Sequence, residues 1–168
     1  MIHAIIVRHA DAGKADSRQY PDDSLRPLSD EGEKEMAKVA RGMVRLGIEI
    51  ESVFDSGYER ARQTSACICD AYNIDPSSIR VLKSLEPDAE PAKTAAELRA
   101  CKDLTCVALV GHMPQLGKLI GYLLAGNTDL SLEIKKAAVC LLEVERWSAG
   151  GATMTALLPP KALRKLAK

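Results

Sequence analysis

The 168 residues are enough for one folded domain whose sheet is covered on both faces, so we expect a single domain over residues 1–168. Lysine plus arginine and aspartate plus glutamate each number 23, which excludes the strongly basic composition typical of nucleic-acid-binding or membrane-binding proteins. No apolar run approaches the length of a membrane span and the amino terminus has no basic leader, so we expect a cytoplasmic protein.

The cysteines and histidines do not form a metal-binding pattern. Cys67 and Cys69 are spaced C-x-C in a helical stretch, which points the two sulfurs to different faces, so we expect reduced thiols. A zinc site made from His3, His9 and His112 is disfavoured, because His3 lies inside a strand and no cysteine or carboxylate spacing supports it. We therefore expect neither a metal nor another cofactor.

The chain opens with a short apolar strand at residues 2–7, and Arg8 and His9 follow where that strand ends. Residues 11–27 are rich in Asp, Gly and Pro, which predicts a long loop, and a loop of this length usually borders a site. Ser29 is the expected N-cap of a helix that Gly47 ends. Its predicted apolar face contains Met36, Val39, Ala40, Met43 and Val44.

A second strand, residues 52–55, leads into a helix with Arg60 in its first turn. The helix macrodipole is positive there, so an arginine in this place is unusual unless it shares a bound anion. Arg62 lies about 200° further around the helix, near its opposite side, and cannot face the same site. We therefore take Arg60 as a site residue and Arg62 as structural.

The second half of the chain alternates strands and helices in the same way. We expect a strand at 80–82, an acidic loop at 85–91, a helix at 91–100, a strand at 104–110, a helix from Pro114 to near Gly126, strands at 137–144 and 152–158 joined by a turn at 149–151, and a short basic helix after Pro160. This order predicts an α/β fold, a three-layer α/β/α sandwich around a mainly parallel mixed sheet of about six strands with one antiparallel strand near the edge.

Charged or basic side chains follow three of the predicted strands: Arg8 with His9, Arg60, and His112. The carboxyl ends of parallel strands meet at one edge of a sheet, so these four side chains can converge although they are far apart in the sequence. Guanidinium groups bind phosphate oxygens in bidentate fashion, and helix amino termini offer free N–H groups. The pattern therefore predicts a site for a small dianion.

Two imidazoles beside this anion site indicate phosphoryl chemistry. A free imidazole titrates near pH ~6.5 and neighbouring arginines favour its neutral form, which can attack phosphorus. His9 is the better nucleophile, because its second nitrogen is free to donate to a backbone carbonyl. His112 would hydrogen-bond the phosphoryl oxygens, helped by Arg8 and Arg60 as charge builds up.

Three motifs together resemble the histidine phosphatase, or phosphoglycerate-mutase-like, superfamily: Arg8-His9, the helix start at residues 60–64, and Gly111-His112. The short chain, with residues 26–29 and Gly32 before the first long helix, looks most like the SixA-type phosphohistidine phosphatases. The resemblance implies a phosphoglycerate-mutase-like fold and a hydrolase that uses no cofactor.

The resemblance also implies residue roles. His9 would form a phosphohistidine intermediate, Arg8, Arg60 and His112 would hold the phosphoryl group, and Arg26 is a weaker candidate phosphate neighbour. The sequence departs from the family pattern at Ala10, where the family usually has glycine, and we expect the methyl group to tighten the floor of the pocket slightly.

The general acid is the least defined part of the motif. Glu86 is the nearest match to the family's carboxylate, with Asp88 and Glu90 as alternatives, and solvated loop charges are an equally good interpretation of all three. An alkoxide leaving group needs a proton, whereas the imidazole of a phosphohistidine is a weaker base and leaves more easily. A site without a clearly defined general acid therefore favours hydrolysis of N–P bonds. We expect a protein that carries phosphohistidine as the partner.

Two other functions remain open at this point. A small-molecule phosphomonoesterase would use Glu86 or Asp88 as its acid. A non-catalytic phosphate-binding module is the alternative from another class, and the intact His9 argues against it.

Overall fold

The computed structural model describes residues 1–130 and 132–167. Its strands and helices alternate along the chain as follows: β1 (Ile2–Arg8), α1 (Asp30–Arg45), β2 (Ser52–Asp55), α2 (Glu59–Tyr72), β3 (Arg80–Val81), α3 (Pro91–Ala100), β4 (Cys106–Gly111), α4 (Gln115–Ala125), β5 (Val139–Val144), β6 (Ala152–Leu158) and α5 (Pro160–Leu166). Three short 3₁₀ helices join them: η1 (Asp23–Leu25), η2 (Pro76–Ser78) and η3 (Lys83–Leu85).

The strands form one sheet in the order β3-β2-β4-β1-β5-β6. β1, β2, β3 and β4 pair in parallel, whereas β5 is antiparallel to both of its neighbours, β1 and β6. β5 is therefore the one reversed strand of the sheet and lies next to its edge. This confirms the predicted mainly parallel α/β fold.

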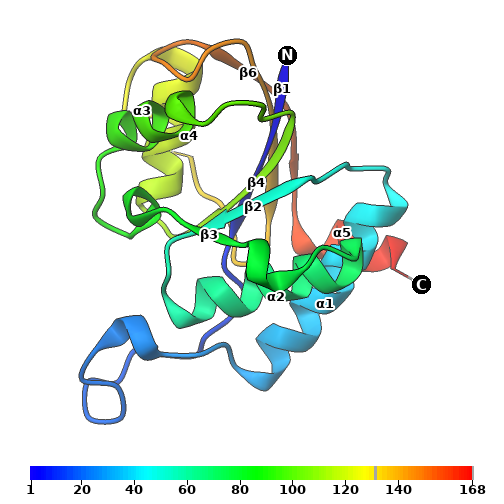
Figure 1. The fold of residues 1–168 in the computed structure, drawn as a ribbon. Helices are drawn as coiled ribbons and strands as arrows, with labels where there is room; N and C mark the ends of the chain where they lie inside the picture. Colours follow the sequence, from blue (N-terminus) through cyan, green and yellow to red (C-terminus); the bar gives the residue numbers. More distant parts are fainter. Residues whose placement is uncertain (131, 168) are drawn as a thin grey trace.

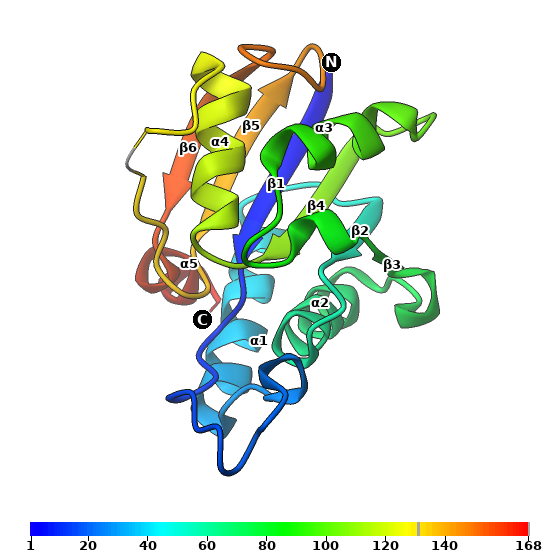
Figure 2. The same ribbon diagram turned by 90° about the vertical axis from the view of Figure 1, so that its left-hand side faces the viewer.

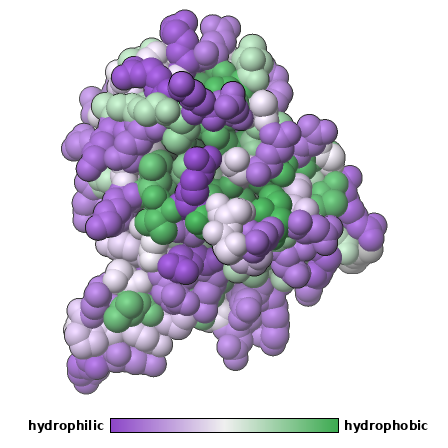
Figure 3. All heavy atoms as spheres, viewed as in Figure 1, coloured by the Kyte–Doolittle hydropathy of each residue, from purple (hydrophilic) through white to green (hydrophobic). Residues whose placement is uncertain are grey.

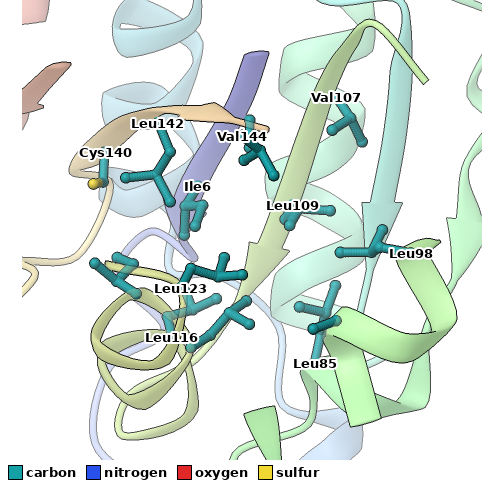
Figure 4. Close-up of a cluster of buried hydrophobic side chains, with 14 of the residues drawn as sticks. Ile6, Leu85, Leu98, Val107, Leu109, Leu116, Leu123, Cys140, Leu142 and Val144 are labelled. Carbon is teal, nitrogen blue, oxygen red and sulfur yellow. The ribbon is translucent and has the colours of Figure 1, made fainter. Parts of the chain in front are cut away.

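Helices cover both faces of the sheet (Figures 1 and 2). On one face α3 and α4 pack on alternate strand residues such as Ile6 and Leu109, and Figure 4 shows this buried cluster. On the other face α1, α2 and α5 pack on the residues between them, such as Ile5 and Val7. Each such side chain contributes about 1.5–3 kcal/mol when it is fully buried, so the two cores hold the strands in a fixed register.

Backbone hydrogen bonds extend the pairing of β1 beyond its last residue. The N–H of His9 donates to the carbonyl of Gly111 at 3.0 Å, and the N–H of Ala137 lies 3.1 Å from the carbonyl oxygen of Arg8. The start of the loop after β1 is thereby fixed between the end of β4 and the segment before β5.

The structure differs from the prediction in local details. The loop at 11–27 contains η1, which Asp22 caps through the N–H of Ser24, and this segment projects from the body with a mainly hydrophilic surface (Figures 1 and 3). Val44, predicted on the apolar face of α1, is 43% exposed. It follows buried Met43 directly, and one residue turns the helix by about 100°, which takes its side chain out of the buried stripe.

All five cysteines are free thiols, as expected, and three of them are buried. Within residues 1–130 and 132–167, no helix has both the length and the apolar character needed to cross a membrane.

Gly32, in the first turn of α1, packs directly on the loop that follows β1. A Cβ atom at this position would overlap the carbonyl oxygen of Asp11, which is backbone and cannot move aside cheaply. We therefore expect Gly32→Ala to lower the free energy of unfolding by about 1–3 kcal/mol in urea denaturation, although alanine normally stabilises a helix interior by about 1 kcal/mol relative to glycine.

The matched control is Lys38→Ala, at an exposed position of the same helix. It should change the free energy of unfolding by less than about 0.5 kcal/mol. A Gly32→Ala protein as stable as the wild type would show that this close approach is not needed.

Candidate active site

Four side chains meet beyond the carboxyl ends of β1 and β4. Arg8 is the last residue of β1 and His9 follows it, Arg60 lies in the first turn of α2, and His112 follows β4. The ring centroids of His9 and His112 are 4.9 Å apart. Both guanidinium groups lie close enough to His9 for their charges to act on its pKa. The structure thus brings together the four residues that the strand ends indicated.

His9 is held as a neutral imidazole with one free nitrogen. The side chain is buried, and its Nδ1 lies 2.7 Å from the carbonyl oxygen of Ala10. A carbonyl can only accept a hydrogen bond, so Nδ1 carries the proton and Nε2 carries the lone pair. Burial, with smaller effects from the charges of Arg60 and Arg8, lowers the pKa of His9 to about 4.

His112 is more deeply buried, with 1% of its surface exposed. Its Nε2 lies 2.7 Å from the hydroxyl of Ser56, and the ring of Tyr58 packs against it with centroids 4.9 Å apart. Its Nδ1 has no hydrogen-bond partner among the described residues. Burial, followed by His9 and Arg60, lowers the pKa of His112 to about 2, so this imidazole is also neutral near pH 7.

Backbone carbonyls from two segments that are far apart in the sequence hold the two arginines. Arg8 donates from Nη1 to the carbonyl of Ile134 at 2.8 Å, and Arg60 donates from Nη1 to the carbonyl of Asp23 at 2.7 Å. The Nε of each is buried and has no partner within the described part of the chain. Arginine stays protonated in proteins, so the site presents two fixed cations with N–H groups to spare for an anion.

Asp23 is a site residue that the sequence reasoning missed. Its carboxylate forms an ion pair with Nη2 of Arg60 at 3.0 Å and another with Nε of Arg26 at 2.8 Å. The hydrogen bond from Arg26, followed by the charge of Arg60, holds the pKa of Asp23 below its usual value. The available signal was its position three residues before Arg26, a spacing that suits an ion pair in a helical turn.

Arg26 itself is largely engaged in holding the loop. Besides the ion pair with Asp23, its Nη1 lies 2.8 Å from the carbonyl oxygen of Ala12 and 3.1 Å from that of Gly13. These contacts occupy its Nε and Nη1 donors. The role of Arg26 as a phosphate neighbour remains a prediction. Arg62 is exposed on α2 and lies outside the site, as expected from the helix geometry.

The residues after Arg60 in its motif fasten two loops to α2. The carbonyl oxygen of the Gln63 side chain accepts the N–H of Leu28 at 2.6 Å. The hydroxyl of Thr64 accepts the N–H of Ala10 at 3.2 Å and donates to the carbonyl of Arg60 at 2.7 Å. The motif therefore serves to position the loop after His9 as well as to supply a cation.

The three candidate acids are placed unequally. Glu86 is half-buried, whereas Asp88 and Glu90 are exposed, and all three line a surface hollow of about 500 Å³ together with Tyr58. The pKa of Tyr58 is raised, chiefly by burial and next by the charge of Glu86. Of the three candidates, Glu86 is thus the carboxylate whose charge acts on the ring packed against His112.

A buried network anchors the segment before Glu86. The side-chain nitrogen of Gln115 donates to the carbonyl of Ser84 at 2.8 Å and to the hydroxyl of Thr94 at 2.9 Å, and Thr94 donates to the same carbonyl. The backbone leading to Glu86 is thereby tied to α3 and α4.

Over the part of the chain that the structure describes, no group of three or more His, Cys, Asp and Glu side chains could hold a metal ion.

Comparison with known proteins assigns this geometry to a family. Residues 4–88 match the family model of the histidine phosphatase superfamily (branch 1). The phosphohistidine phosphatase SixA of Escherichia coli (strain K12) is 33% identical over 129 residues, which cover 76% of this chain and 77% of that protein. This chain belongs to the histidine phosphatase superfamily.

Solved structures agree with the assignment. A protein histidine phosphatase SixA complexed with tungstate superposes on this histidine phosphatase with a TM-score of 0.83 at 28% identity, covering 96% of this chain and 99% of that one. A mycobacterial glucosyl-3-phosphoglycerate phosphatase is 15% identical and superposes with a TM-score of 0.66. The superposition covers 95% of this chain and 100% of that one, which shows a shared fold. The predicted resemblance to SixA-type histidine phosphatases is confirmed.

The low pKa of His9 leads to a prediction for the free protein. The imidazole signals of His9 should titrate near pH 4 in an NMR pH series, rather than near the ~6.5 of a histidine-containing model peptide, which serves as the control. A midpoint of 6 or above would show that the ring is not desolvated as the structure has it.

The same shift fixes the sign of a stability effect. The unfolded chain binds a proton at His9 near pH ~6.5, whereas the folded chain binds it only near pH 4. The contribution of His9 to the free energy of unfolding is therefore complete above about pH 6.5 and is lost as the pH falls from there toward 4. The loss should be about 1–3 kcal/mol. His9→Gln, which cannot titrate, should show a shallower pH dependence of urea unfolding.

Proposed function

We propose that this protein hydrolyses the N–P bond of phosphohistidine on another protein, through a phosphorylated intermediate at His9. The observation that carries the proposal is the bond from Nδ1 of His9 to the carbonyl of Ala10, because it leaves a neutral Nε2 beside two arginines. The similarity to the phosphohistidine phosphatase SixA of Escherichia coli supports it, as does the tungstate in a SixA structure, since tungstate is a tetrahedral oxyanion like phosphate.

In the first step, the lone pair on Nε2 of His9 attacks phosphorus while the N–P bond of the substrate breaks. The departing imidazole nitrogen keeps the bonding electron pair, and the group leaves as neutral imidazole when its other nitrogen carries a proton. Arg8, Arg60 and His112 donate to the phosphoryl oxygens as negative charge builds up, an effect of about 3–4 kcal/mol for one such donor in other enzymes.

In the second step, a water molecule attacks phosphorus and Nε2 of His9 takes back its electron pair. Inorganic phosphate leaves and the neutral imidazole is restored, still held by the carbonyl of Ala10. An imidazole in the same place but with no free nitrogen could help to bind phosphate, yet it could not form the phosphorylated intermediate. The free Nε2 of His9 therefore favours an enzyme over a phosphate-binding module.

A phosphorylated side chain on another protein can enter only a site that is open to solvent. The segment between Arg60 and His112 has few residues left to form a lid over the site. Those 51 residues contain the rest of α2, η2, β3, η3, α3 and β4, all of which belong to the sandwich or are single turns. A phosphorylated side chain on another protein is therefore the partner we propose.

Glu86 is the carboxylate we propose as proton donor where one is needed. It is half-buried beside Tyr58, whereas solvent surrounds Asp88 and Glu90. An N–P bond needs this help least, so the proposed substrate is consistent with an acid that lies at the margin of the site.

The substrate class is tested by comparing N–P with O–P compounds. Purified protein should dephosphorylate a phosphohistidine protein or phosphoramidate at least about 10-fold faster, in kcat/KM, than simple sugar phosphates, because only the alkoxide requires a strong acid. His9→Ala should lose turnover entirely while keeping its fold by circular dichroism, and a phosphorylated His9 should be trapped in the wild type by rapid alkaline quench. The reverse ranking would indicate a small-molecule phosphomonoesterase, and phosphate binding without turnover would indicate a binding module.

The role of Glu86 is tested by Glu86→Gln. Hydrolysis of a phosphomonoester should fall about 100-fold or more, as for loss of a general acid, while hydrolysis of phosphoramidate should change only a few-fold. Lys93→Gln, at an exposed position in the same hollow, is the control for a change of surface charge. A selective loss in Asp88→Asn or Glu90→Gln instead would transfer the role to that residue.

A further inference from the structure

Ser56 occupies the turn between β2 and α2 and contacts the imidazole of His112. The residue is 2% exposed, and its hydroxyl oxygen lies 2.7 Å from Nε2 of His112. The same oxygen accepts the backbone N–H of Tyr58 at 3.3 Å. The side chain therefore joins the start of α2 to the imidazole after β4.

The backbone of this turn is held in a conformation that favours glycine. Gly57 has φ +83°, a value that favours glycine, and its N–H donates to the carboxylate of Asp55 at 2.8 Å. A Cβ at Gly57 would also press on Val81 in β3. Ser56 is thus presented to His112 by a fixed turn, the same turn that begins the helix carrying Arg60.

The number of protons available decides the direction of the hydrogen bond. A serine hydroxyl has one proton to donate and two lone pairs to accept with. If Ser56 donates to Nε2 and accepts from Tyr58, its proton and one lone pair are both used. If Nε2 donated instead, the hydroxyl proton would be left without an acceptor among the described residues, at a buried position where such loss is unfavourable.

The other nitrogen of the ring then carries the proton. In a neutral imidazole one nitrogen donates and the other accepts, and the partner of one nitrogen sets the state of the other. Nδ1 of His112 is buried and has no partner within the described residues, and the ring lies beside His9. A proton on this nitrogen is placed to donate to an anion that reaches His9.

We propose that Ser56 is a positioning residue that fixes His112 as the Nδ1–H tautomer, so that this N–H donates to a phosphoryl oxygen during transfer to His9. The tautomer follows from the hydrogen bonds alone, whereas its consequence for the rate rests on the proposed phosphatase function. Without Ser56 the ring can carry its proton on Nε2, and Nδ1 would then present a lone pair to the phosphoryl oxygens.

The tautomer is measured directly by two-bond ¹H–¹⁵N correlation NMR on the uniformly labelled protein, with His112 assigned by comparison with His112→Gln. The wild type should show a protonated Nδ1 and an unprotonated Nε2. In Ser56→Ala this state should be mixed or reversed, and in Ser56→Thr, which keeps the hydroxyl, it should be retained. An unprotonated Nδ1 in the wild type overturns the proposal, whether or not any variant folds.

The kinetic arm uses phosphoramidate as the probe. Ser56→Ala should lower kcat about 10- to 100-fold, less than the loss of a whole donor, and Ser56→Thr should recover most of it. Ser65→Ala is the matched control, since Ser65 is also a buried serine and no hydrogen bond joins it to His112. Its kcat should stay within about 2-fold of the wild type.

The two arms separate the proposals. A wild type that hydrolyses no phosphoryl compound would reject the phosphatase function, while the NMR measurement would still decide the tautomer. Ser56→Ala with an unchanged tautomer and an unchanged kcat would reject the positioning role, while the activity of the wild type would still support the function.

Discussion

The parallel pairing of β1 with β4 is the constraint on which the site depends. Its register places Arg8 opposite Gly111, and the N–H of His9 continues the ladder to the Gly111 carbonyl. His9 and His112 are therefore neighbours because each is the next residue after a paired strand end. A slip of one residue would turn every side chain of β1 to the other face of the sheet, and burial of alternate residues in two separate cores prevents it.

Burial of two neutral imidazoles beside two cations gives the site its chemical character. The low pKa values of His9 and His112 keep both rings unprotonated, so Arg8 and Arg60 hold the positive charge and the imidazoles supply a lone pair and an N–H. Asp23 neutralises part of the charge of Arg60 through an ion pair at the outer end of the guanidinium. In the proposed function, an incoming phosphoryl dianion would meet an Arg60 that is already paired with Asp23 of η1.

The sequence was sufficient for the features that depend on one segment at a time. The apolar strand ending in Arg8-His9, the arginine in the first turn of a helix, and Gly111-His112 after a buried strand each follow from local pattern, and parallel strand ends then bring them together. Asp23 was missed because an aspartate in a polar loop looks solvated until its partner Arg60 is placed beside it. Likewise, three acidic residues on one loop are equivalent in sequence, and only their unequal exposure separates Glu86 from Asp88.

Ala10 shows how a departure from a family pattern can be accommodated. The residue is fully buried and belongs to the same core cluster as Ala61 and Leu28. Its N–H is held by Thr64 and its carbonyl by His9, so both polar groups of its backbone are already in use. The added carbon therefore adds buried apolar contact to the core, and its effect on the width of the pocket floor stays a prediction.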